Sequence, residues 1–291
     1  MSDFEVKSQV RQFYNQIGWQ MLSDGFYQNA RYEDLRPVSS EYIHRCHMRI
    51  NRHICKEGYM LLDAGSGPVQ YPEYLTYSEG YKYRVCVDIS IVALQEARQR
   101  VKEKGLYVVA DVAHMPFKDG VFDGEVSLHT LHHLPADDKK PAYLELFRVL
   151  APGKTAAIVN GWTDSGLMKL SFWFVRLMEI IGIRIAELRG KQERKTKENK
   201  AANASKDNEP TGTYIQKMTP EWMKQELANV FSYKIYVWRS VNVRFLRAVV
   251  HKPFAGKFFL RMLYGLEEMA PHFFGKHGQY PLVIISKSDN Q

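Results

Sequence analysis

The segment 61–68 (LLDAGSGP) joins a short apolar run, an acid and a Gly-x-Gly turn. About 20 residues after this turn, a second apolar run, 85–88 (VCVD), also ends in an acid. Glycines let the backbone approach a ligand closely, and the later acid can accept hydrogen bonds from ribose hydroxyls. The two segments therefore predict a nucleotide-type cofactor site at the carboxyl ends of parallel strands.

The residues around the turn indicate which cofactor this is. A dinucleotide site needs a third glycine for tight helix packing, and Gln70 stands there instead. Asp63, directly before the turn, would repel a pyrophosphate but suits an ammonium group. S-adenosylmethionine carries an α-ammonium and a sulfonium and no phosphate. The segment resembles the first motif, D-x-G-x-G, of the class I S-adenosylmethionine-dependent methyltransferases.

Three further segments carry the same resemblance. Asp111 ends the apolar run 107–110, the segment 122–134 reads FDGEVSLHTLHHL, and the segment 144–154 reads LELFRVLAPGK. The last two are similar to the "FD…V…LHHL" and "E…RVLKPGG" segments of the type 11 group, which includes ubiquinone and menaquinone biosynthesis enzymes. Lys154 replaces the usual second glycine. The resemblance covers residues 60–160 and is weak beyond residue 165.

The resemblance assigns residues to each part of the cofactor. It implies that Asp63 and the backbone of Gly65, Ser66 and Gly67 bind the methionyl ammonium and carboxylate, and that Asp88 binds the ribose. It places Ile89 against the adenine ring and Asp111 and Val112 at the adenine edge. Leu128 and His129 lie where the methyl group is delivered to the acceptor.

Methyl transfer is an in-line displacement at a sulfonium, so positioning supplies much of the acceleration. A base is needed only where the acceptor is a hydroxyl, an acidic carbon or a protonated amine. His129, His132 and His133 are the candidates, and His129 and His133 are the stronger ones. His129 is equally suited to packing under the cofactor, and His133 to capping a helix. Tyr14, in a segment that resembles the family's lid, either covers the cofactor or lies on a buried helix face.

The rest of the chain fits the fold that the resemblance implies. Predicted strands cover 59–63, 84–88, 106–110, 122–128, 155–160, 231–238 and 280–286. Predicted helices cover 4–22, 39–57, 69–78, 90–104, 137–150, 163–185, 219–229 and 244–274, the last broken near Pro253 and Pro271. Alternating strands and helices indicate an α/β, doubly wound, mostly parallel seven-stranded sheet, Rossmann-like and with a helical cap.

We expect four regions along this fold. Residues 1–58 form an N-terminal helical lid, and 59–162 form the cofactor-binding α/β core. Residues 163–218 hold a cap helix and a charged flexible loop at 189–212, where large apolar side chains are nearly absent. Residues 219–291 complete the sheet and carry the helical insertion 244–274.

Composition indicates the cellular compartment in which the protein is expected. The 291 residues include three cysteines without paired spacing, which favours a reducing compartment. No signal peptide and no long uncharged apolar run are visible, so a cytoplasmic protein is expected. His44 and His47 share a helix face, but no second ligand pair follows, and no metal site is predicted.

The acceptor is the least determined part. Segments 167–185 and 244–274 interleave large apolar residues with basic ones, which is typical either of a helical cap over an apolar pocket or of peripheral membrane contact. Both favour a small, apolar or natural-product-like acceptor, methylated on O, N or C. The alternatives are a membrane-associated lipid or quinone methyltransferase, an enzyme that methylates RNA or protein through the basic 189–206 segment, and a binding module without activity. Residues 127–130 (SLHT) lack an Asn/Asp-Pro-Pro-Tyr tetrad, which disfavours nucleic acid.

Overall fold

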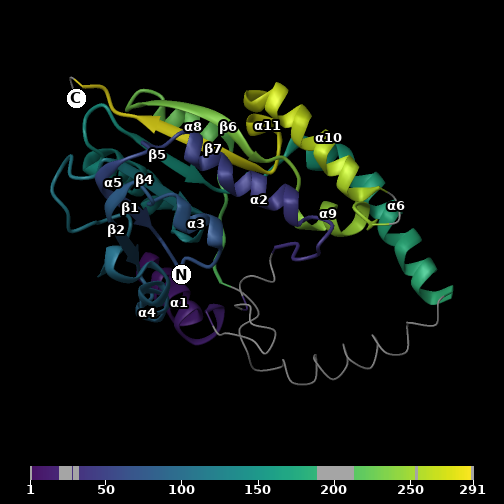
Figure 1. Ribbon diagram of the computed structural model, residues 1–291, viewed down its shortest axis with the longest axis horizontal. Helices are drawn as coiled ribbons and strands as arrows, with labels where there is room; N and C mark the ends of the chain where they lie inside the picture. Colours follow the sequence, from purple (N-terminus) through teal and green to yellow (C-terminus); the bar gives the residue numbers. More distant parts are fainter. Residues whose placement is uncertain (1, 20–27, 29–32, 189–212, 253–254, 290–291) are drawn as a thin grey trace.

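The computed structural model describes residues 2–19, 28, 33–188, 213–252 and 255–289, with the side chains of 185–188 excepted. Its centre is one seven-stranded sheet in the order β3-β2-β1-β4-β5-β7-β6. The strands are β1 (Gly58–Ala64), β2 (Tyr81–Asp88), β3 (Gly105–Val109), β4 (Gly124–Leu128), β5 (Thr155–Val159), β6 (Ser232–Arg239) and β7 (Tyr280–Ser286). Helices cover both faces of this sheet (Figure 1).

The sheet is mostly parallel, as predicted. The first five strands pair in parallel, and β7 runs antiparallel to both β5 and β6. The central strands β2 and β4 are buried over most of their length, which is the pattern of parallel sheets covered by helices on both faces. The order reverses at β1, whose neighbours are β2 and β4, so the crevice for a ligand opens at the carboxyl end of β1.

The helices before and between the parallel strands are mostly shorter than predicted. They are α1 (Asp3–Phe13), α2 (Ser40–Met48), α3 (Pro72–Thr76), α4 (Ile91–Val101) and α5 (Ala136–Val149). The predicted helix 4–22 is α-helical only to Phe13 and continues as a π-helical turn, η1 (Tyr14–Gly18), while residues 20–22 lie outside the described part of the chain. The predicted helix 39–57 stops early, because a 3₁₀ turn, η3 (Arg49–Arg52), ends it.

The helices after β5 are α6 (Gly166–Leu188), α8 (Pro220–Leu227), α9 (Val243–Val249), α10 (Gly256–Met269) and α11 (Pro271–His277). Thr219 caps α8, since its side chain accepts a hydrogen bond from the Trp222 backbone. The predicted break at Pro271 is confirmed, because this proline begins α11. Pro253 and the charged segment 189–206 lie outside the described residues.

The protein has a second apolar core away from the sheet. It gathers buried side chains of α2, α6, α9 and α10, among them Tyr42, Val175, Leu246 and Leu260. Buried Glu267 of α10 joins this core to the sheet, since it accepts from the Tyr42 hydroxyl at 2.7 Å and from the Ser240 backbone at 2.9 Å. The helices that extend furthest from the sheet in Figure 1 are therefore held by a core of their own.

Candidate functional site

A cavity of about 520 Å³ opens at the carboxyl ends of the parallel strands. Every residue that the sequence assigned to cofactor or catalysis lines it: Tyr14, Asp63, Gly65, Ser66, Gly67, Asp88, Ile89, Asp111, Val112, Leu128, His129 and His133. The carboxyl ends of neighbouring parallel strands meet at one edge, which brings these separate motifs together. All of these residues line the same cavity, whereas the role of each one stays a prediction.

The Gly-x-Gly turn has a conformation that requires glycine. Gly65 and Gly67 have φ of 71° and 53°, in the left-handed region. A Cβ on Gly65 would lie 2.1 Å from the Thr130 side chain, so substitution there is blocked sterically as well. The backbone N–H groups of Gly65 and Ser66 donate to the Val87 carbonyl at 2.7 and 3.0 Å, which fixes the turn against the end of β2.

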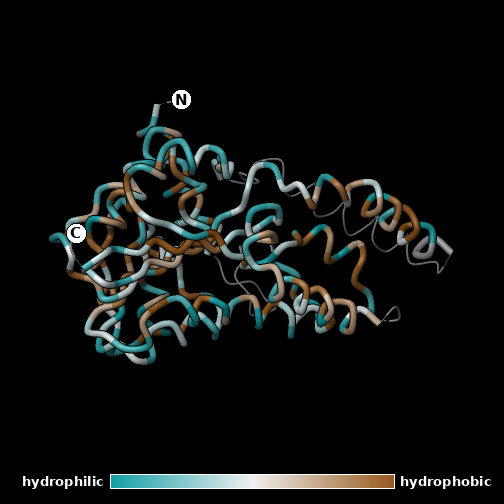
Figure 2. Tube along the Cα trace, turned by 90° about the horizontal axis from the view of Figure 1, so that it is seen from above, coloured by the Kyte–Doolittle hydropathy of each residue, from teal (hydrophilic) through white to brown (hydrophobic). Residues whose placement is uncertain are grey.

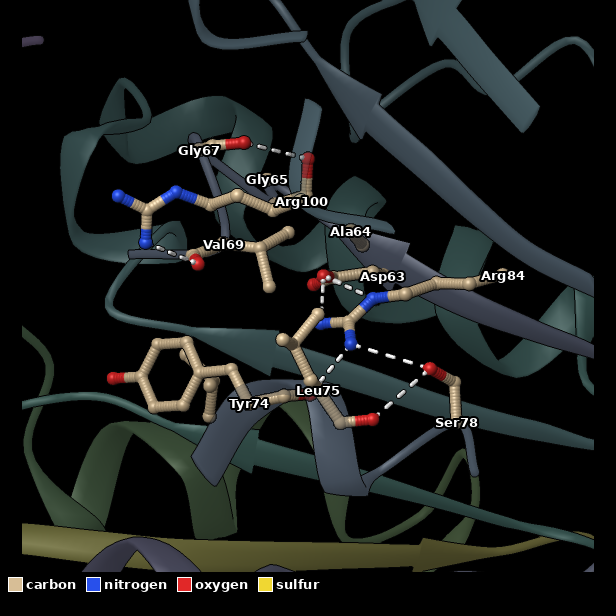
Figure 3. Close-up of polar contacts among 12 residues, drawn as sticks. Asp63, Ala64, Gly65, Gly67, Val69, Tyr74, Leu75, Ser78, Arg84 and Arg100 are labelled. Carbon is tan, nitrogen blue, oxygen red and sulfur yellow. Dashed lines mark hydrogen bonds and ion pairs between the residues drawn. The ribbon is translucent and has the colours of Figure 1, made fainter. Parts of the chain in front are cut away.

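Asp63 is more tightly held than the sequence suggested. Its Oδ2 accepts hydrogen bonds from Nε and Nη2 of Arg84, at 3.0 and 2.5 Å, and both side chains are buried (Figure 3). Arg84 also donates to the Tyr74 carbonyl at 2.5 Å. The charge of Asp63 is therefore neutralised inside the protein, and its Oδ1 is the oxygen left to meet a ligand at the cavity wall.

Asp88 connects the end of β2 to the glycine turn. Its Oδ2 accepts from the Gly67 N–H at 2.9 Å and its Oδ1 from the Ser90 N–H at 2.8 Å. Burial raises the pKa of this carboxyl to about 6, even though these backbone donors act in the opposite direction. Each carboxylate oxygen keeps a second lone pair, so an ionised Asp88 can still accept hydrogen bonds from a pair of hydroxyl groups.

Asp111, predicted to read adenine, also holds the N-terminal helix. Lys7 of α1 bridges two carboxylates, with its Nζ 2.5 Å from Oδ2 of Asp111 and 2.6 Å from Oδ2 of Asp138. Burial favours a protonated Asp111, but the hydrogen bonds from Lys7 and from the Ala113 N–H, together with the charges of Lys7 and His114, outweigh it and lower the pKa of Asp111. Helix α1 is thereby tied to the cavity at the end where adenine is expected.

His129 occupies strained backbone at the end of β4. Its φ of 57° is in the left-handed region, and its N–H donates to the Val159 carbonyl at 2.7 Å. The imidazole lies edge-on to the rings of Trp238 and Tyr280, with centroids 5.0 and 5.5 Å away. Burial, aided by nearby Arg239, lowers the pKa of His129 to about 3. A neutral ring of such low basicity suits packing better than proton removal.

His133 forms hydrogen bonds through both ring nitrogens. Its Nδ1 lies 2.8 Å from the Tyr214 carbonyl oxygen, which can only accept, so Nδ1 carries the proton. Its Nε2 then accepts from the Tyr14 hydroxyl, also at 2.8 Å. Burial lowers the pKa of His133 to about 4. The neighbouring His132 is also buried, and burial lowers its pKa well below the ordinary range.

The turn η1 places aromatic rings over the cavity. Tyr14 stacks on Trp19 with centroids 5.1 Å apart, and the Trp19 ring lies 3.0 Å from where a Cβ on Gly67 would stand. The N-terminal segment therefore covers the glycine turn from above, while Tyr14 reaches across to His133.

Several cavity residues were missed by sequence reasoning. Thr213, Ile215 and Lys217 line the cavity from an extended strip, 213–218, where alternate residues face the same side. The strip is held by hydrogen bonds from the Gln216 N–H to the His132 carbonyl at 2.8 Å and from the Thr163 N–H to the Met218 carbonyl at 2.9 Å. Its alternation was a usable signal, but it follows the charged segment, and no motif marks it.

The other missed wall comes from β6 and β7. Trp238, Arg239 and Tyr280 line the cavity together with Glu33, whose Oε1 lies 2.5 Å from Nη1 of Arg239. These residues stand at the ends of the two antiparallel strands, beyond the part of the chain that carries family motifs.

S-adenosylmethionine fits the donors and acceptors of this cavity. Asp88 offers acceptors for hydroxyl groups, and the Gly65–Gly67 backbone permits close approach. Gln70 Oε1 lines the same cavity, is buried and has no hydrogen-bond partner in the described part of the chain, so it can receive a donor such as an ammonium. In those same residues no group of three or more acidic, His or Cys side chains is placed to hold a metal ion.

Comparison with known proteins agrees with this geometry. Residues 62–158 match the family described as methyltransferase domain. The chain is 31% identical over 108 residues to methyltransferase GfsG of Streptomyces halstedii, which covers 35% of this chain and 38% of that protein. It is 29% identical over 132 residues to the ubiquinone/menaquinone biosynthesis C-methyltransferase UbiE of Haemophilus ducreyi, covering 43% and 50%. The matched segment thus spans half or less of the length of these relatives.

A solved structure extends the likeness to the whole fold. The [4+2]-cyclase SpnF superposes with a TM-score of 0.51 and 14% identity, covering 97% of both chains. That protein is named a cyclase, so the shared fold does not by itself determine the reaction. The match to the methyltransferase domain family implies S-adenosylmethionine as the cofactor.

Proposed function

We propose that the chain is an S-adenosylmethionine-dependent methyltransferase that methylates a small molecule with an apolar body, since residues 62–158 match the methyltransferase domain family and the sheet has seven mostly parallel strands. The observation that carries this proposal is the convergence of all the cofactor motifs on one cavity, with Asp88 and the glycine turn directly connected. Bound S-adenosylmethionine would supply an activated methyl group. The protein would supply position and exclude water.

The cavity residues divide into two halves on this proposal. Asp63, Asp88 and Asp111 lie at the successive ends of β1, β2 and β3 and would hold the cofactor. Lys217, Trp238 and Tyr280 lie beyond β4 and would face the acceptor. Tyr14 and Trp19 would cover the cofactor, which makes the N-terminal region the lid. The aromatic wall of the acceptor half favours an acceptor with an apolar or aromatic body.

General-base catalysis by His129 receives little support. A ring with a pKa of about 3 is neutral at physiological pH but is a weak base, and no hydrogen-bond acceptor is paired with it among the residues that the structure describes. His133, with a pKa of about 4, is also a weak base, and it is the better candidate on geometry, because its unprotonated Nε2 meets the Tyr14 hydroxyl in the cavity. We propose that any proton leaving an acceptor would pass to this Tyr14–His133 pair, and that acceptors already nucleophilic would need no base.

The experiment combines cofactor binding with transfer of label. Wild-type protein should bind S-adenosylhomocysteine in a calorimetric titration and should move radioactive methyl from S-adenosylmethionine to a small-molecule fraction of a cell extract. Asp88→Asn should weaken binding at least about tenfold, the effect of losing a charged acceptor for a hydroxyl pair. Asp137→Asn, an exposed carboxylate on α5, is the matched control. Binding that is unaltered by Asp88→Asn, or label confined to RNA or protein, would overturn the proposal.

A second proposal concerns where the acceptor is met. Helix α6 is buried at Val175 and exposes most of its other large apolar side chains, including Leu170, Trp173 and Leu177 at 82%, 74% and 53%. In Figure 1 it runs away from the sheet, and in Figure 2 hydrophobic residues recur along its length. Exposed Arg176 lies on the same helix. Apolar side chains beside cations match an anionic lipid surface, so we propose peripheral contact through α6.

Vesicle sedimentation tests this contact. The protein should sediment with phosphatidylcholine vesicles that contain phosphatidylserine and much less with phosphatidylcholine alone. Trp173→Ser should reduce sedimentation, whereas Leu106→Ser, which removes an exposed apolar side chain of β3 on the body of the sheet, should not. Equal sedimentation of both variants would contradict the contact. No described helix is long and apolar enough to cross a bilayer.

A further inference from the structure

The acceptor half of the cavity contains a lysine without a counter-ion. Lys217 lines the cavity and has no ion pair or hydrogen bond among the described residues. Its side chain lies against the end of β5, where a Cβ on Gly161 would stand 3.4 Å from the Lys217 Nζ. Burial lowers the pKa of this amine, which reflects the cost of holding the charge without a partner.

A second cation, on the cavity wall formed by β6 and β7, has only part of its hydrogen bonds satisfied. Arg239 is 2% exposed, and its Nη1 pairs with Oε1 of Glu33 at 2.5 Å. Its Nε is buried and has no hydrogen-bond partner in the described structure. The guanidinium carbon lies 4.7 Å from the Tyr280 ring centroid, and Tyr280 in turn lies beside His129. An unpaired buried N–H that borders a cavity is a place for a ligand's acceptor atom.

The charges of this half do not cancel. Arg239 pairs with the carboxylate of Glu33, and Lys217 pairs with no carboxylate of the described residues, whereas on the cofactor side Asp63 is balanced by Arg84. Arg244, which also lines the cavity, is paired with Glu179 at 2.8 Å. Among the described residues that line the acceptor side, one positive charge, that of Lys217, therefore remains. Both Lys217 and Arg239 lie close enough to His129 to lower its pKa, so they act on the same part of the cavity.

We propose that the methyl acceptor is an amphipathic acid, with a carboxylate held by Lys217 and Nε of Arg239 and an apolar body packed on Trp238 and Tyr280. A single carboxylate matches the single excess charge, and the aromatic rings supply the apolar surface. The carboxylate orients the acceptor and is distinct from the atom that takes the methyl group. This inference rests on the proposed methyltransferase function.

The first experiment follows the label by solvent partition. Purified protein, S-adenosylmethionine with a tritiated methyl group and an extract of the source organism are incubated, and the labelled product is extracted into organic solvent at pH 3 and at pH 9. A product that carries a carboxylate enters the solvent only at pH 3. Label that enters at both pH values, or at neither, overturns the proposal.

The second experiment tests the two cations. For the acid-extractable product, the KM for the acceptor in the extract should be at least about tenfold higher in Lys217→Met than in wild type. A similar rise is expected in Arg239→Lys, which keeps a positive charge facing Glu33 but removes the Nε donor. Lys224→Met removes an exposed lysine of α8 and serves as control. An unchanged KM in Lys217→Met overturns the proposal.

A cofactor-binding measurement distinguishes a failure of the carboxylate proposal from a failure of the proposed methyltransferase function. S-adenosylhomocysteine should bind wild type, Lys217→Met and Lys224→Met with equal affinity, because Lys217 lies on the acceptor side. If wild type binds S-adenosylhomocysteine and transfers label to a neutral product, the carboxylate proposal fails and the methyltransferase stands. If wild type neither binds it nor transfers label, the proposed function fails, and this inference fails with it.

Discussion

Nε and Nη2 of Arg84 both donate to a single oxygen of Asp63, at 3.0 and 2.5 Å, in the buried interior between β1 and β2. The acid that begins the cofactor motif is thus also half of a buried ion pair. Removing one partner of such a pair leaves the other charge unpaired, which costs far more than the pair itself contributes.

Asp63→Asn is therefore expected to lower the free energy of unfolding by about 3–5 kcal/mol in urea denaturation. The double variant Asp63→Asn/Arg84→Met should recover most of this loss, since it removes the stranded charge. Asp119→Asn, which breaks the exposed pair with Arg148, should cost less than about 1 kcal/mol. A single variant as stable as wild type would contradict the buried pair, and S-adenosylhomocysteine binding by the refolded double variant measures what Asp63 contributes to the ligand.

Tyr14→Phe removes the hydroxyl that donates to His133 and keeps the ring that stacks on Trp19. Loss of one buried hydrogen bond to an otherwise satisfied imidazole is worth about 1 kcal/mol, so S-adenosylhomocysteine affinity should fall about fivefold through loosening of the covering segment. Calorimetric titration measures this directly. Tyr59→Phe, whose ring is exposed on β1, is the control and should bind as wild type. Identical affinity of Tyr14→Phe and wild type would show that the ring alone covers the cofactor.

The pKa of about 6 for Asp88 predicts a pH dependence of cofactor affinity. Ribose hydroxyls donate to the ionised carboxylate, so protonation opposes binding. Affinity for S-adenosylhomocysteine should be constant above about pH 6.5 and should fall, by up to about tenfold per pH unit, as the pH drops below 6. His129 and His133, with pKa values of about 3 and 4, stay neutral in this window. In Asp88→Asn the dependence should vanish, and its persistence would exclude Asp88 as its source.

Glu125 of β4 predicts that the stability of the fold depends on pH, here because the folded protein holds a carboxyl group in its protonated form. Both of its carboxyl oxygens are buried without a partner among the described residues, and burial raises its pKa well above the ordinary range. The folded state therefore keeps a proton that the unfolded chain releases at neutral pH. The contribution of this group is most favourable below the unfolded pKa and is lost as the pH rises through the folded one.

Glu125→Met should consequently raise the free energy of unfolding at pH 8 by about 1–3 kcal/mol and change it less at pH 4.5, measured by urea denaturation. Glu57→Met, an exposed site before β1, provides the comparison and should be nearly neutral at both pH values. A variant that is destabilised equally at both pH values would mean that Glu125 is paired in solution.

The cofactor half of the cavity was predictable because its residues belong to short motifs. Asp63, Asp88 and Asp111 each close an apolar run, and strand ends in a parallel sheet converge without further information. The partner of Asp63 was not predictable in the same way. Leu61, not Asp63, is the residue opposite Arg84, so the contact is a diagonal one that requires the register of β1 against β2.

The acceptor half depends on contacts distant in sequence. Lys217 reaches the cavity because the strip 213–218 lies along the end of β5, and Arg239 because β6 and β7 pair antiparallel at the sheet edge. Neither residue stands in a motif. The bounds of the N-terminal helices were wrong for a local reason, since propensity does not reveal where α1 changes to the wider turn that holds Tyr14.

On the proposed function, the strip 213–218 would determine which acceptor binds, while the strands and the glycine turn would hold the cofactor. Its anchors to the rest of the fold include main-chain groups, such as the Gln216 N–H and the Met218 carbonyl, that do not depend on which side chains it carries. Thr213, Ile215 and Lys217 can therefore change in combination without disturbing the sheet or the glycine turn. Substitutions at these alternating positions, in nature or in the laboratory, could therefore change which acceptor is bound while the fold and the cofactor site stay the same.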